Sequence, residues 1–160
     1  MKTYITFLFI ISSIVAFAQT GNRNYRVEVL KKNVIQKEFV YGKWTEKGET
    51  ETRLKYLGLI NAKNGKVYKI MNSVWIWGLS GRATNRIVVF NKKNQYLGNY
   101  YITMSNELPI EIKNGYLIFK NIDEDCDKRI ETKINFNYGI PKSIFRKCST
   151  ELGDAYNFEE

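Results

Sequence analysis

The side chains that could carry chemistry are limited in this chain, because it contains no histidine. Without histidine there can be no Ser-His-Asp or Cys-His catalytic arrangement and no histidine zinc site. Carboxylates such as Glu107 and Glu111 could in principle act as an acid/base pair, but solvated strand and loop positions explain them as well. The short glycine-containing stretch 78–81 lacks the Lys-Ser/Thr pair and the helix of a phosphate-binding loop. The sequence therefore predicts a protein that is not an enzyme and has no cofactor.

One acidic segment begins with the residue spacing of a calcium-binding loop. Asp123, Asp125 and Asp127 stand at alternate positions, as the first three ligands of such a loop do. The sixth position is not glycine, and Ile134 stands where a bidentate glutamate is needed. The segment is therefore expected to be a solvated acidic turn, and no metal site is predicted.

The two cysteines, Cys126 and Cys148, are expected to form one disulfide. Such a bond persists outside the cytosol, and an even number of cysteines in an exported chain favours pairing. The alternative, a catalytic thiol, would need an activating base that the chain does not offer.

Two tryptophans form a candidate ligand-binding pair. Trp75 and Trp77 are two residues apart, so in a strand they share a face at a separation of about 7 Å. Aromatic residues with this spacing either stack on sugar rings or fill a core, and both interpretations stay open. With Trp44, they are the predicted ligand-binding residues.

The stretch Gly42-Lys43-Trp44 gives the only family resemblance. A Gly-x-Trp near the start of a chain of eight to ten antiparallel strands resembles the first-strand signature of lipocalin-like barrels. The resemblance implies that Trp44 closes one end of a barrel and that the strands enclose a small apolar ligand. Gly42 can equally be a bulge in an edge strand.

The N-terminal residues 1–18 have the features of a secretory signal peptide. Lys2 supplies a positive lead, residues 4–15 are apolar, and residues 16–18 are a small-x-small cleavage signal that predicts cleavage after Ala18. The apolar run is shorter than the roughly 20 residues that span a bilayer as a helix. We expect a secreted or periplasmic protein with no transmembrane segment after cleavage.

After the signal peptide, residues 19–149 are predicted to form a single all-β domain, followed by an acidic tail, 150–160, that is expected to be loose. Short β-prone runs alternate with turn residues, which predicts about ten antiparallel strands in a meander-type sandwich or barrel. The expected strands lie near residues 25–31, 35–45, 52–62, 67–77, 86–91, 95–104, 109–113, 116–122, 129–137 and 143–148.

Two hairpins give the clearest local predictions. The first runs from Leu54 to Trp77 around Asn64-Gly65, and the second from Pro109 to Ile122 around Asn114-Gly115. Asn-Gly suits a two-residue turn because both positions tolerate positive φ. The first hairpin is apolar on both faces, so we expect it at the centre of the sheet.

Lysine-asparagine pairs recur in four of the expected turns, and a meander would place all four turns at the same end of the sheet. The chain is basic, with a formal net charge of +9. Its basic residues are scattered rather than clustered in a run, which disfavours nucleic acid as a partner. The predicted anion-binding residues are Lys32, Lys63, Lys93 and Lys113.

Together these observations predict an exported, non-catalytic β-domain that acts as a binding or interaction module at the cell envelope or outside the cell. The alternatives are a lipocalin-like carrier of a small apolar ligand and a glycan-binding module. The partner is therefore a protein, a glycan or a small apolar ligand.

Overall fold

The structure is a computed structural model that describes residues 20–160, with side chains described from Tyr25 onward. The described chain consists mainly of antiparallel strands, with one α-helix and one short 3₁₀ helix. The predicted signal peptide, residues 1–18, lies outside the described residues. The elements are Thr20–Lys32 (α1), Glu38–Gly42 (β1), Glu51–Asn61 (β2), Val67–Trp77 (β3), Arg82–Asn91 (β4), Tyr96–Ile102 (β5), Ser105–Glu107 (η1), Glu111–Lys113 (β6), Tyr116–Lys120 (β7), Glu131–Asn135 (β8), Ser143–Lys147 (β9) and Gly153–Glu159 (β10).

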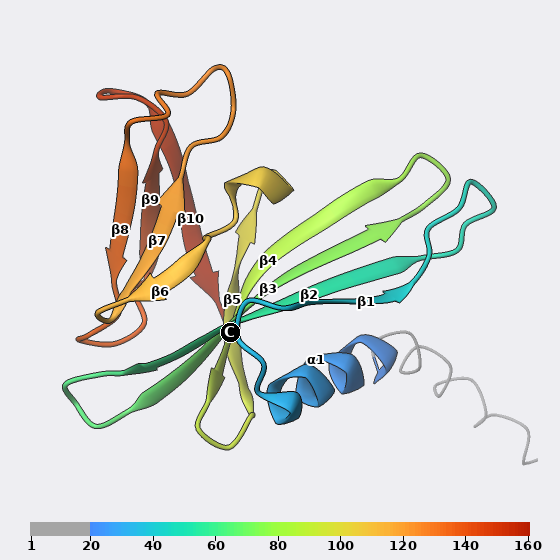
Figure 1. Cartoon of the computed structure of the whole chain (residues 1–160), viewed down its shortest axis with the longest axis horizontal. Helices are drawn as coiled ribbons and strands as arrows, with labels where there is room; N and C mark the ends of the chain where they lie inside the picture. Colours follow the sequence, from blue (N-terminus) through green and yellow to red (C-terminus); the bar gives the residue numbers. More distant parts are fainter. Residues whose placement is uncertain (1–19) are drawn as a thin grey trace, which may run out of the picture.

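The strands form two antiparallel sheets, which confirms the predicted all-β class. The larger sheet has the order β1-β2-β3-β4-β5-β10-β9, and the smaller one has the order β6-β7-β8. The meander holds from β1 to β5, but β6 to β8 leave to build the second sheet and β10 returns beside β5. In Figure 1 the β1–β2 and β3–β4 connections project to the upper right, away from β6 to β10 on the left.

The main core lies between the two sheets. Fully buried side chains from both sheets meet there, including Ile70, Ile87 and Tyr100 from the large sheet and Leu117 and Phe119 from β7. The small sheet contacts β2 at one edge and β9 at the other. The described strands nevertheless form two open sheets, not a closed barrel, and aromatic and aliphatic side chains fill the space between them.

The opposite face of the large sheet is covered by α1, where the sequence predicted a strand at 25–31. Tyr25, Val27 and Val29 alternate with polar residues, which is the pattern that suggested a strand. In the helix, Val29 and Leu30 face the sheet and are buried. The Glu28–Lys32 ion pair at i,i+4 adds local support at 2.6 Å. The helical spacing is favoured because it buries both apolar residues on one face.

The acidic tail is also different from the expectation, because residues 153–159 form a strand instead of a loose end. β10 pairs with β9 over residues 153–157 and with β5 at Phe158 and Glu159. Tyr156 is buried, and Phe158 packs against the main core. The segment forms a strand despite its acidic residues, because the alternating aromatic side chains of Tyr156 and Phe158 face inward and pack against the core.

The two Asn-Gly hairpins form as predicted, but their turns differ. At Asn114-Gly115 both residues have positive φ, and Lys113 pairs with Tyr116 across a two-residue turn. Between β2 and β3 the connection is longer, covering residues 62–66, and only Gly65 has positive φ. The β2–β3 hairpin lies inside the sheet between β1 and β4, which is the central position its two apolar faces predicted.

Among residues 20–160, no helix combines the length and hydropathy that a bilayer crossing requires.

Candidate functional site

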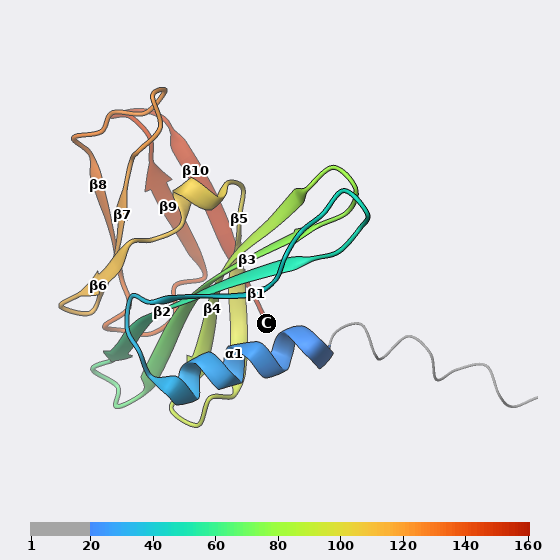
Figure 2. The same cartoon turned by 45° about the vertical axis from the view of Figure 1, so that its right-hand side comes forward.

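The connections that carry most of the turn lysines gather at one end of the sheet, which we call the turn end. It comprises the β2–β3 connection (62–66), the β4–β5 connection (92–95), the β6–β7 turn (114–115), the β8–β9 connection (136–142) and the C-terminus of α1. Asn137 joins two of these: its carbonyl accepts from the Lys63 amide at 2.7 Å, and its side chain donates to the Asn114 carbonyl at 3.4 Å. Figure 2 shows the β2–β3 and β4–β5 connections and the end of α1 together at the lower edge.

An open groove of about 850 Å³ lies between the β2–β3 and β4–β5 connections, and we call it the aromatic groove. Lys66, Lys92 and Lys93 line it, and all three are exposed. Its apolar lining is supplied mainly by Tyr68, Tyr96, Leu97, Ile140 and Phe158.

A second groove, of about 520 Å³, lies on the α1 side of the same connections, and we call it the helix-side groove. It brings Lys31 from the end of α1 beside Lys69 of β3 and Lys92. Val67 and Lys92 line both grooves. The two grooves are therefore the two sides of one basic surface.

The four predicted anion-binding lysines occupy different environments at this end. Lys93 lines the aromatic groove, and Lys113 is exposed where β6 ends. Lys32 pairs with Glu28 and lies over the Phe39 ring, which neutralises its charge locally. The topology therefore brings these lysines to one end, but only part of the predicted set is unpaired.

Lys63 is engaged with Tyr138. Its ammonium lies 4.7 Å from the ring centroid and donates to the phenol oxygen at 3.0 Å. This hydrogen bond raises the pKa of Lys63 and lowers the pKa of Tyr138, because each partner stabilises the charged form of the other. Both groups are exposed, so the contact orders the surface more than it stabilises the fold.

The lipocalin resemblance implied that Trp44 closes one end of a barrel. In the structure Trp44 does not have this role. Its indole donates to the Gly78 carbonyl at 2.8 Å, and its ring lies against Gly81, where an added Cβ would approach it to 3.1 Å. Trp44 thus ties the segment after β1 to the β3–β4 turn on the projecting part of the sheet. Gly81 also has positive φ, so two constraints favour glycine there.

Trp75 and Trp77 share a face of β3, as predicted, but they stack on each other. Their ring centroids are 5.5 Å apart and their planes differ by 21°. The guanidinium of Arg82 lies 5.8 Å from the Trp77 ring, and the Trp77 indole donates to Thr84 at 3.0 Å. A stacked pair covers one face of each ring, so it does not present the two neighbouring open faces of a sugar platform. Both residues are half-buried, so they are neither fully buried core residues nor fully open binding residues.

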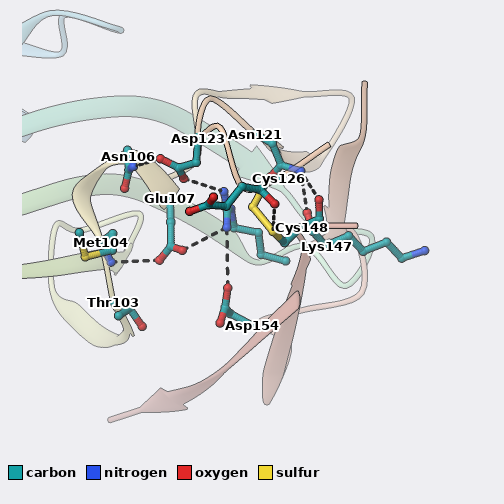
Figure 3. Close-up of polar contacts among 12 residues, drawn as sticks. Thr103, Met104, Asn106, Glu107, Asn121, Asp123, Cys126, Lys147, Cys148 and Asp154 are labelled. Carbon is teal, nitrogen blue, oxygen red and sulfur yellow. Dashed lines mark hydrogen bonds and ion pairs between the residues drawn. A yellow bond between two sulfur atoms is a disulfide. The ribbon is translucent and has the colours of Figure 1, made fainter. Parts of the chain in front are cut away.

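A second group of charged side chains is centred on Arg146 of β9. Arg146 is 1% exposed and forms ion pairs with Glu107 at 3.1 Å and with Asp123 and Asp154 at 3.7 Å each (Figure 3). Its Nε and Nη2 atoms have no hydrogen-bond partner among the described residues. We call this group the Arg146 cluster.

Three hydrogen-bond donors converge on the Glu107 carboxylate. Besides Arg146, the Met104 amide donates to it at 3.0 Å and the Tyr156 hydroxyl at 2.9 Å. The Arg146 cluster therefore cross-links η1, the 121–130 connection and the β9–β10 hairpin.

Sequence reasoning did not find the Arg146 cluster, although β9 carries one signal of it. Strand residues 143–147 alternate in burial, and Ile144 marks the inward face. Arg146 is two residues further on, so it must point the same way. An arginine at an inward position needs carboxylate partners.

The Cys126–Cys148 disulfide is present, as predicted, at the edge of this cluster. Asn121 reinforces the same junction, because its side-chain amide donates to the carbonyls of Asp127, Lys147 and Cys148 at 3.0 to 3.2 Å.

The acidic segment is a turn, as expected. Asp127 forms a bidentate pair with Arg129, whose guanidinium lowers the Asp127 pKa to about 2. Among residues 20–160, no group of His, Cys, Asp and Glu side chains is arranged to hold a metal ion.

Stability is expected to fall between about pH 10 and 12, partly because of Tyr156; burial also raises the pKa of Tyr100, which adds to the loss over the same range. Burial raises the pKa of this tyrosine to about 12 from an ordinary value near 10.0. The unfolded chain therefore loses its phenol proton first, and folding loses about 2 kcal/mol as pH rises through this window. Urea unfolding from pH 8 to 11.5 measures the decline. Tyr156→Phe should start less stable and decline less steeply, with the remaining slope carried by Tyr100; an unchanged slope would exclude a contribution from Tyr156.

Comparison of the chain with protein-family models, with curated proteins and with solved structures gives no match. Its function is therefore inferred from its own residues.

Proposed function

We propose that the protein is an exported, non-catalytic binding module and that its turn end binds an anionic ligand. The observation that carries this proposal is the convergence of lysines from the end of α1 and from two hairpin connections on two adjacent grooves. Positive side chains on facing walls add their potentials and attract anions.

The lysines of the grooves differ in how far their charge is already compensated. Lys69 donates to Asn94 at 2.6 Å, which is a neutral partner that leaves the charge in place. The side-chain ammonium groups of Lys66, Lys92 and Lys93 form no hydrogen bond or ion pair with any residue in the described part of the chain. Glu160 is the only carboxylate residue among the described lining residues of the two grooves.

Export is supported by two independent features. The N-terminal sequence has the layout of a signal peptide, and the Cys126–Cys148 bond is of a kind that persists in oxidising compartments. Periplasmic and fully secreted locations are both compatible with these features.

The alternative functions receive less support. A lipocalin-like carrier needs a ligand space inside the strands, whereas aromatic and aliphatic side chains pack between the two sheets. A glycan platform needs open ring faces, whereas Trp75 and Trp77 stack on each other.

Replacing Lys66, Lys92 and Lys93 together with glutamine is expected to weaken binding of inorganic polyphosphate about tenfold or more, since each exposed charge contributes about 0.5 kcal/mol. Isothermal titration at 50 and 200 mM salt measures this, and binding should weaken as salt rises. The matched control replaces Lys43, Lys47 and Lys128, which are exposed residues outside both grooves. Equal losses in the two triple variants, or no binding by the unmodified protein, would contradict the proposal.

A further inference from the structure

The aromatic groove has a lining that an inorganic anion alone would not use. Lysines stand along the two connections that border it, while Tyr68, Leu97, Ile140 and Phe158 give it an apolar surface. We infer that this groove takes an anionic amphiphile, a small molecule with one compact anionic group and an apolar body. The inference rests on the proposed function and names the ligand class of the same site.

The apolar lining is continuous with the main core. Tyr68 is a buried member of that core, and Leu97, Ile140 and Phe158 are half-buried residues packed against it. These side chains are held from below by packed neighbours, so the surface they offer is preformed. Preformed apolar surface next to a few polar groups is the usual composition of a small-molecule site.

The size of the groove also favours a ligand larger than an inorganic anion. Its volume of about 850 Å³ lies within the range of roughly 300 to 1,000 Å³ typical of sites for drug-sized ligands. An anion bound at the lysines would leave the apolar lining in contact with water. A ligand with an attached alkyl chain or ring would cover that lining and gain the corresponding hydrophobic free energy.

The anionic group is assigned to the lysine side of the groove by the state of its charges. Lys92 and Lys93 are adjacent in the β4–β5 connection, and Lys66 faces them from the β2–β3 connection. None of the three ammonium groups has a partner among the described residues, whereas the ammonium group of the neighbouring Lys63 donates to Tyr138. Phosphate, sulfonate and carboxylate head groups share the chemistry that these ammonium groups recognise.

The test compares octyl phosphate with inorganic phosphate and with octyl glucoside, each below its critical micelle concentration, by isothermal titration on the full chain. Because each buried methylene contributes about fourfold, octyl phosphate should bind at least about thirtyfold more tightly than inorganic phosphate. It should also bind more tightly than the uncharged octyl glucoside, which has the same chain and no anionic group.

Variants locate the two parts of the ligand. The Lys66, Lys92 and Lys93 glutamine variant should weaken both octyl phosphate and polyphosphate. Leu97→Asn and Ile140→Asn, made separately, should weaken octyl phosphate about tenfold and leave polyphosphate binding unchanged. Retained polyphosphate binding shows that these two variants are folded.

The outcomes separate the inference from the proposed function. If polyphosphate binds through the lysines but octyl phosphate binds no more tightly than phosphate, the amphiphile inference is wrong and the anion-binding function stands. Binding to vesicles with anionic lipids but not to octyl phosphate would also overturn it, since it would indicate a membrane surface instead of a free ligand. If neither anion binds, both proposals fail.

Discussion

Replacing Arg146 with methionine is expected to lower the free energy of unfolding by about 3–5 kcal/mol, since removing one partner of a buried ion pair strands the other charge. Arg146 is 1% exposed, and the side chain of Glu107, its nearest partner, is 12% exposed. Glu107 would keep its donors from Met104 and Tyr156 but lose its counter-charge. Urea unfolding at pH 7 measures the change, and a loss of this size is a large fraction of the stability of an ordinary domain.

The chain supplies a matched control for this variant. Arg129 also forms an ion pair, with Asp127 at 2.8 Å, but its side chain is 90% exposed. Arg129→Met should therefore cost less than about 1 kcal/mol. Combining Arg146→Met with Glu107→Gln should recover part of the loss, because the second change removes the stranded charge. If Arg146→Met lowered the free energy of unfolding no more than Arg129→Met, the Arg146 cluster would not stabilise the packing of these segments.

The central strands could be predicted because local and tertiary signals agree in them. Residues 67–77 were predicted as a strand, and β3 covers Val67–Trp77. The run is rich in β-branched and aromatic residues, follows an Asn-Gly turn and pairs on both sides.

The two ends of the domain were predicted wrongly because there the local signals conflict. In residues 25–31, period-two alternation competes with the adjacent pair Val29 and Leu30, and only a helix buries both on one face. In residues 153–159, acidic residues surround Tyr156 and Phe158, and the strand forms because β5 and β9 offer it backbone partners. Tertiary contacts determine the secondary structure of both segments, and such contacts cannot be inferred from the neighbouring residues in the sequence.

The candidate site divides in the same way. From β1 to β5 the meander alternates its connections between two ends, so the gathering of the lysines in the β2–β3 and β4–β5 connections follows from strand order and could be predicted. The Arg146 cluster could not, because Glu107 follows the end of β5, Asp123 lies after β7 and Asp154 is in β10. These carboxylates meet Arg146 only once the second sheet has packed and β10 has returned to β9. The same packing built the core contacts beneath the aromatic groove, so the pairing of an apolar lining with lysines also required the structure.

Replacing Cys126 and Cys148 together with serine is expected to lower the free energy of unfolding by about 3 kcal/mol, given the 22-residue separation of the two cysteines. The loss arises mainly in the unfolded state, which gains freedom when the cross-link is removed. Asn121 bonds three carbonyls at the same junction, so the native loop should keep its place without the disulfide. Urea unfolding should therefore show a lower midpoint together with a steeper dependence on urea, because the unlinked chain exposes more surface.

The unmodified protein with its disulfide reduced should behave like the double serine variant, since both lack the same cross-link. Binding of polyphosphate should be equal in all three forms at low urea, because Cys126 and Cys148 contribute to neither groove of the turn end. A double variant as stable as the unmodified protein would show that Asn121 and the Arg146 cluster already restrict this segment before folding. A variant that loses polyphosphate binding while still folded would show instead that the disulfide end and the turn end are coupled through the core between the two sheets.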